Sequence, residues 1–139
     1  MQSIETLSGL QWFAPLGVAG LLITFGSLLR EPARQRFSAV FLAGAGGAYL
    51  SGGFGVWEFA FCAVITVLAY FGLQHYRAIA AGWLLHSAWD VAHHLWGHPI
   101  IPFAPSSSIG CAICDPVLAL WYGAGAPTIW RLHRRRAPG

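Results

Sequence analysis

Five long apolar segments dominate this sequence and leave few polar residues with which to coat a water-soluble core. A helix of about 20 residues spans the roughly 30 Å hydrocarbon core of a bilayer at a rise of about 1.5 Å per residue. Only 9% of the residues are charged, whereas soluble domains carry about 25%. The sequence therefore predicts an all-α, polytopic membrane helix bundle built as a single domain, residues 1–139. The five predicted transmembrane helices are residues 9–29, 37–50, 54–73, 78–96 and 116–130.

The second segment differs from the others, because it is short and rich in glycine. Gly44, Gly46 and Gly47 favour close packing of this helix against a neighbour, since small residues let two backbones approach. Four spanning helices plus a re-entrant second segment is therefore the alternative topology.

The basic residues set the orientation of the bundle. With five spans, all of them fall in the first loop, the third loop and the C-terminal tail, which share one side of the membrane. The positive-inside rule then places the N-terminus outside and residues 131–139 inside as a basic cytoplasmic tail, in what we expect to be a bacterial cytoplasmic membrane. The same rule explains the positive net charge without a nucleic-acid partner. These residues are Arg30, Arg34, Arg36, Arg77, Arg131, Arg134, Arg135 and Arg136.

Prolines mark the expected boundaries of the last helix. Asp115-Pro116 is typical of a capping residue followed by Pro at the first helical position. Residues 97–114 then form a long outer loop, and Asp115 is expected at the outer end of the last helix.

The fourth segment carries ionisable residues where lipid-soluble ones are expected. At about 100° per residue, His86, Asp90, His93 and His94 fall within an arc of roughly 100° on one helix face. Ionisable groups at membrane depth are costly unless paired or liganded, so they indicate a functional site.

A carboxylate on the third segment is predicted to face this polar stripe. The third and fourth segments form an antiparallel hairpin that turns near His75, and Glu58 and His93 each lie about seventeen residues from that turn. Mixed carboxylate and imidazole ligands suit Zn²⁺, Fe or Mn²⁺ better than Ca²⁺ or Mg²⁺. The sequence therefore predicts a divalent transition-metal site near the outer leaflet, with Zn or Fe as the expected metal. Its predicted ligands are Glu58, Asp90, His93 and His94, with His98 or Asp115 completing the shell.

Two other interpretations of the same residues stay open. The cluster can be a buried salt-bridge network that holds the bundle together, or a relay for protons or cations. His86 lies about two turns deeper than His93, so we expect it to orient Asp90 by a hydrogen bond, and His86 and Asp90 are the expected catalytic pair.

The two cysteines of the outer loop allow three interpretations. Cys111 and Cys114 form a CxxC pair, which is a redox signature near a helix N-terminus. With His94 and His98 they also give a spacing that zinc accepts. The third interpretation is a structural disulfide.

Haem is a weaker cofactor hypothesis. Bis-histidine ligation needs two imidazoles at one depth on facing helices. Only the fourth segment supplies histidines in the outer half, so a homodimer would be required.

Four motifs together resemble an uncharacterised family of small bacterial integral membrane proteins. The resemblance implies a polytopic membrane fold, and no activity, cofactor or catalytic residue comes with it. The motifs are Glu31-Pro-Ala-Arg, Gly53-Phe-Gly-Val-Trp-Glu58, His86-Ser-Ala-Trp-Asp90-Val-Ala-His-His94 and Gly110-Cys-Ala-Ile-Cys-Asp115-Pro.

These observations favour a metal-dependent membrane hydrolase or oxidoreductase that acts on a small or lipid-soluble substrate. The alternatives are a thiol–disulfide or quinone-linked redox protein, a cation or proton transporter, and an accessory subunit of a membrane complex. The lipid bilayer is the expected partner in each case, and a homo-oligomer is compatible with all of them.

Overall fold

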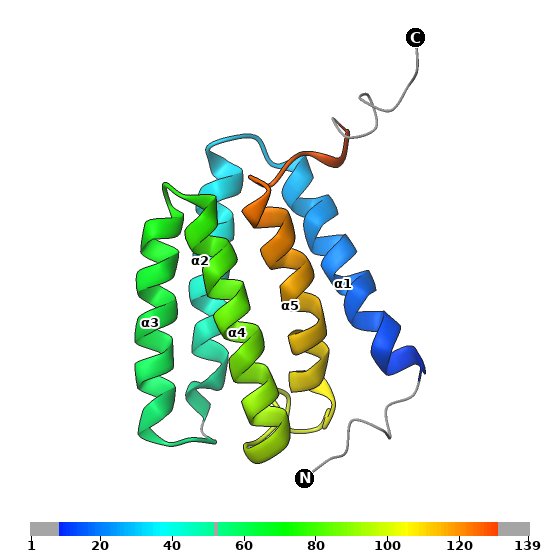
Figure 1. Cartoon of the computed structure of the whole chain (residues 1–139), viewed down its shortest axis with the longest axis vertical. Helices are drawn as coiled ribbons and strands as arrows, with labels where there is room; N and C mark the ends of the chain where they lie inside the picture. The colour runs from blue at the N-terminus through cyan, green and yellow to red at the C-terminus, as the bar shows by residue number, and fades with distance from the viewer. Residues whose placement is uncertain (1–8, 52, 131–139) are drawn as a thin grey trace.

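The computed structural model describes residues 9–51 and 53–130, and in this part of the chain all regular structure is helical (Figure 1). The predicted all-α fold is confirmed for these residues, while the basic tail, residues 131–139 with Arg131, Arg134, Arg135 and Arg136, lies outside the described residues. The elements are α1 Gly9–Leu28, α2 Ala33–Gly47, the 3₁₀ helix η2 Ala48–Ser51, α3 Val56–Gly72, α4 Tyr76–Trp96 and α5 Ser107–Gly123.

Successive helices run in opposite directions, so the connections alternate between the two ends of the bundle (Figure 1). The α1–α2 connection carries Arg30, and the α3–α4 turn leads directly into Arg77. Both lie at the same end, as predicted, and the α2–α3 and α4–α5 connections lie at the other (Figure 1). The arrangement brings α4 against α3 and α5, whereas α1 packs mainly on α5 and barely touches α2.

Apolar side chains cover the outside of this bundle. Many large hydrophobic side chains are exposed there. Examples are Phe13 at 71%, Val40 at 68%, Phe59 at 67% and Leu120 at 76% exposed. By length and composition, α1 is the helix of the described chain that could cross a membrane, through residues 11–28, and α3 is apolar but shorter at 17 residues.

Charged and polar side chains, by contrast, lie inside. Arg34, Glu58, His86, Asp90 and Asp115 are all buried. Arg34 donates hydrogen bonds to the carbonyl oxygens of Gly26 at 2.9 Å and Ala126 at 2.7 Å. It therefore ties the end of α1 to the segment that follows α5, a buried role that its position in an arginine cluster did not predict.

Gly46 lets α2 pack closely against a neighbour, as the sequence predicted, whereas a Cβ atom at Gly44 or Gly47 would meet nothing within 4 Å. A Cβ atom at Gly46 would lie 2.6 Å from Ile65 Cγ2 on α3, too close for any side chain there. On α4, a Cβ atom at Gly82 would collide with Leu42 of α2.

The predicted start of the last helix was wrong. α5 begins at Ser107 and contains Pro116 in its interior, so the outer loop is residues 97–106 and not 97–114. Pro116 has no N–H to donate to the carbonyl of Ala112. Ser87 of α4 donates its hydroxyl to that carbonyl instead, with an Oγ–O distance of 2.9 Å. Because a neighbouring helix replaces the missing bond, the helix continues through the proline.

Candidate metal centre

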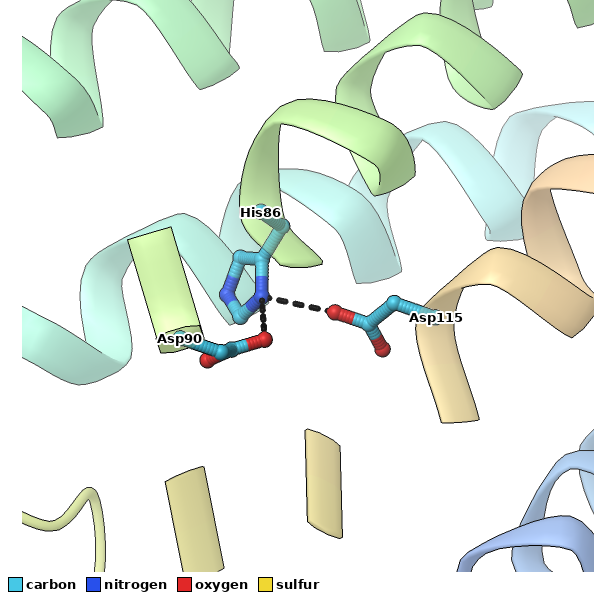
Figure 2. Close-up of side chains that lie close together, drawn as sticks. All are labelled: His86, Asp90 and Asp115. Atoms are coloured by element: carbon cyan, nitrogen blue, oxygen red, sulfur yellow. Dashed lines mark hydrogen bonds and ion pairs between the residues drawn. The ribbon is translucent and has the colours of Figure 1, made fainter. Parts of the chain in front are cut away.

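Three buried side chains meet where α4 passes α5. His86 and Asp90 stand one turn apart on α4, and Asp115 reaches them from α5 (Figure 2). His86 Nδ1 lies 3.0 Å from Asp90 Oδ2 and 2.9 Å from Asp115 Oδ2. The three residues are 2%, 0% and 3% exposed, so water screens this charge cluster very little.

The second ring nitrogen fixes the tautomer of His86. Its Nε2 lies 3.1 Å from the backbone oxygen of Ala45 on α2. A carbonyl oxygen can only accept a hydrogen bond, so Nε2 carries the proton. In the neutral ring, the lone pair of Nδ1 then points at two carboxylate oxygens. The lone pair and the negatively charged oxygens repel each other. Either a proton or a bound cation must therefore lie between Nδ1 and the carboxylates.

A hydrogen bond also fixes Asp90. Tyr49 of η2 donates its hydroxyl to Asp90 Oδ1, which leaves Oδ2 turned toward His86. Ser108 supports Tyr49 from α5, at an O–O distance of 3.3 Å. Neither residue was predicted from the sequence, because a Tyr in a glycine-rich segment and a Ser in a predicted loop carry no ligand spacing.

The donor set suits a divalent transition metal. One imidazole nitrogen and two carboxylate oxygens lie within 4.8 Å of one another. In residues 9–51 and 53–130, no other three His, Cys, Asp or Glu residues meet in this way. A metal held by these three side chains would keep a further coordination position free, as catalytic zinc sites do. A ligand histidine that donates its other N–H to a backbone carbonyl is the usual partner of such a metal.

A second buried pair lies nearer the end of α4. His93 Nε2 is 3.0 Å from Glu58 Oε1, an ion-pair distance without the alignment of a hydrogen bond. Glu58 also accepts N–H groups from Trp89 at 3.0 Å and from the backbone of Phe54 at 2.9 Å. The predicted approach of Glu58 to His93 across the α3–α4 hairpin is thus confirmed.

The predicted single centre, however, is wrong, because its ligands separate into different places. Asp90 and Asp115 join His86, while Glu58 and His93 form their own pair. The His98 side chain is exposed, and its backbone oxygen lies 3.0 Å from His93 Nδ1. His94 is buried, and neither ring nitrogen has a partner among the described residues. His86 thus contacts both carboxylates directly and does more than orient Asp90.

The structure bears on the three interpretations of the cysteines, because both of them lie in a helix and not in a loop. Cys111 and Cys114 lie inside this helix as free thiols, and Cys62 on α3 is also free. The predicted zinc set with His94 and His98 does not come together in the described chain.

The His86 cluster borders a cavity of about 570 Å³. His86, Cys111, Cys114 and Asp115 lie along it, and apolar side chains of α1, α2 and α5 form most of the remaining wall. The volume is within the roughly 300–1,000 Å³ typical of small-molecule sites.

Comparison with known proteins identifies a family for this chain and nothing more specific. No curated protein and no solved structure matches it. A family of unknown function does match, over residues 10–128, a range that includes every residue of the His86 cluster and its cavity. The chain therefore belongs to DUF6010, a family of unknown function.

Proposed function

We propose that this protein is a polytopic membrane protein, of a bacterial cytoplasmic membrane, with a metal-dependent enzymatic site inside its bundle. The support for membrane insertion is the distribution of side chains. Large apolar residues cover the outside, and three of the acidic residues, Glu58, Asp90 and Asp115, are buried inside. In a water-soluble bundle, apolar side chains lie inside and polar side chains cover the outside, since exposed apolar surface on this scale promotes aggregation.

The metal site is carried by one observation, the contact of His86 Nδ1 with two carboxylate oxygens. Zn²⁺ or Fe²⁺ at this point would take Nδ1, Asp90 Oδ2 and Asp115 Oδ2 as ligands. It would also compensate the two negative charges that the buried cluster otherwise concentrates around one imidazole.

The cavity supports an enzymatic role. His86 and Asp115 both border it, so the open coordination position can be reached by a molecule bound there. A metal in such a site supplies Lewis-acid polarisation of an oxygen or a water nucleophile at neutral pH. The protein's part is to hold its ligands rigid: Ala45 fixes the ring of His86, and Tyr49 fixes Asp90.

The test is the metal content of protein purified in detergent and reloaded separately with Zn²⁺, Fe²⁺ and Mn²⁺. We expect about one equivalent of one metal, falling below about 0.1 equivalent in Asp115→Asn and His86→Ala. Size-exclusion profiles report whether these variants remain folded. The matched control is Glu31→Gln, an exposed carboxylate outside the cluster. A folded wild-type protein that takes up less than about 0.1 equivalent of every metal contradicts the proposal.

A thiol-based redox function is the second candidate, favoured by the position of Cys111 and Cys114 on the wall of the same cavity. Its mark is a reversible two-electron titration of this pair. A Cys111→Ser variant with unchanged activity would eliminate it.

A further inference from the structure

A second cavity, of about 880 Å³, lies at the end of the bundle opposite the α4–α5 connection. Its wall comes from the end of α1, the α1–α2 connection and the segment that follows α5. Figure 1 shows these three segments meeting at that end. The backbone N–H of Ile129 donates to Ser27 Oγ at 3.4 Å and holds the last segment against α1. His86, Asp90 and Asp115 do not line this cavity, so its occupant is separate from the proposed metal.

The described part of this wall carries more positive than negative charge. Arg30 is exposed, Arg34 is buried, and the one carboxylate beside them is that of Glu31. Glu31 Oε1 lies 3.4 Å from Arg34 Nη1. This pair leaves Arg30 without a counter-charge among the described residues of the wall. An occupant with one negative charge would therefore make the wall neutral.

Arg34 contributes charge, and Arg30 is the arginine free to donate. Arg34 Nε and Nη2 donate to the backbone oxygen of Leu29 at 3.1 and 2.7 Å, and Nη1 donates to that of Ala126 at 2.7 Å. Carbonyl oxygens have no net charge, so these bonds orient the guanidinium and leave it positive. The exposed guanidinium of Arg30 can donate two parallel N–H bonds, which match the oxygens of a phosphate group.

Apolar side chains beside the arginines indicate that the anionic group belongs to a lipid. Leu28 and Trp130 line the cavity and are 63% and 56% exposed. A small water-soluble anion gains nothing from such a surface, whereas acyl chains can lie along it. Tryptophan is also enriched at the depth of lipid headgroups. The wall thus combines contacts for a phosphate with contacts for the chains attached to it.

We propose that this cavity binds the phosphate group of an anionic phospholipid, with Arg30 as the donor and the acyl chains beside Leu28 and Trp130. The inference rests on the membrane insertion in the proposed function and not on the metal site. A zwitterionic phospholipid also has a phosphate, but its ammonium group adds a positive charge to a wall that already has an excess. The site therefore prefers lipids of net negative charge.

The test is native mass spectrometry of the full-length, metal-free protein in nonionic detergent, titrated with dioleoyl phosphatidylglycerol or dioleoyl phosphatidylcholine. These two lipids have the same chains and differ in headgroup charge. We expect the Kd of the first bound phosphatidylglycerol to be at least about fivefold lower than that of phosphatidylcholine. Glycerol 3-phosphate, which has the phosphate without the chains, should bind at least about tenfold more weakly than phosphatidylglycerol.

Charge variants assign the preference to this cavity. Arg30→Gln should raise the Kd for phosphatidylglycerol at least about threefold. Arg77→Gln removes the same charge at the same end of the bundle, from an exposed residue that does not line the cavity, and should leave the Kd unchanged. Glu31→Gln removes the carboxylate of the wall and should lower the Kd about threefold. Damage to the fold would not tighten binding.

A second matched pair adds charge to the segment that follows α5. Thr128→Glu places a carboxylate on the wall, at a half-buried residue, and should raise the Kd for phosphatidylglycerol at least about threefold. Ala124→Glu places the same group at an exposed residue that does not line the cavity, and should leave the Kd unchanged.

Three results overturn the proposal. Equal Kd values for the two lipids contradict the preference for negative charge, and equal losses in Arg30→Gln and Arg77→Gln contradict the site. Glycerol 3-phosphate binding as tightly as phosphatidylglycerol contradicts a lipid as the occupant. Membrane insertion is measured separately, by resistance of the protein to extraction from membranes with alkaline carbonate. Extraction contradicts the proposed function, whereas a resistant protein without lipid preference contradicts this inference alone.

Discussion

The ring of Tyr49 stacks on the imidazole of His93, with centroids 4.0 Å apart and planes inclined by 24°. The hydroxyl of the same side chain donates to Asp90. Tyr49 therefore contacts two buried polar groups, the Glu58–His93 pair through His93 and the His86 cluster through Asp90. Its hydroxyl fixes one ligand of the proposed metal.

Tyr49→Phe should weaken metal binding and leave the packing of the core intact. The phenyl ring still stacks on His93, but Asp90 Oδ1 loses its donor and the carboxylate can rotate away from His86. Loss of a comparable hydrogen bond behind a metal ligand lowers affinity about 10–100-fold. Competition with a chromogenic chelator measures the change.

Tyr76→Phe is the matched control for this measurement. Tyr76 also donates its hydroxyl to a carboxylate, that of Glu31, but at the opposite end of the bundle and in an exposed position. It should leave metal affinity unchanged. Equal losses in both variants would show that Tyr49 acts through general stability and not through Asp90.

The parts of the site that sequence could predict are those set by local geometry. A short hairpin places residues equidistant from its turn at the same depth, and this correctly brought Glu58 to His93. The spacing of His86 and Asp90 at i and i+4 likewise predicted their contact on one face of α4.

The parts of the site that the sequence did not predict depend on neighbouring helices. Asp115 was placed at a helix end because Pro116 follows it, but α5 begins eight residues earlier at Ser107. At 1.5 Å per residue, that moves Asp115 about 12 Å into the bundle, to the level of His86. The rotation of α4, which turns Asp90 toward α5 and His93 toward α3, is set by packing and leaves no trace in the spacing.

Ser87 should contribute to stability because of Pro116. In Ser87→Ala, the buried carbonyl of Ala112 loses its donor, and we expect a loss of about 1–3 kcal/mol in the free energy of unfolding. In a Pro116→Ala background the backbone N–H returns, so Ser87→Ala should lower the free energy of unfolding by clearly less. Unfolding of the four proteins of this double-mutant cycle in detergent gives the coupling. Additive effects would refute the compensation between Ser87 and Pro116.

Two glycines two residues apart on α2 should respond oppositely to alanine. At Gly46 the added methyl would collide with Ile65, so Gly46→Ala should destabilise the protein by about 1–3 kcal/mol. At Gly44 it would meet nothing within 4 Å, so Gly44→Ala should be neutral or stabilise the helix by about 0.5–1 kcal/mol. Midpoints of thermal unfolding in detergent check the pair. Similar midpoints for both variants would show that α2 and α3 are not in close contact at Gly46.

Glu58→Gln separates the two buried groups experimentally. Glutamine retains the shape, but its NH₂ group turns toward the N–H groups of Trp89 or Phe54, and His93 loses its carboxylate. Removing one partner from such a buried pair costs about 3–5 kcal/mol, so a large loss in the free energy of unfolding is expected. Glu31→Gln, at an exposed carboxylate, should cost no more than about 1 kcal/mol. Metal content per folded protein should nevertheless stay unchanged in Glu58→Gln, because Glu58 lies outside the His86 cluster. If the folded Glu58→Gln protein loses its metal, then Glu58 and Asp90 serve one centre, and the division into two groups is incorrect.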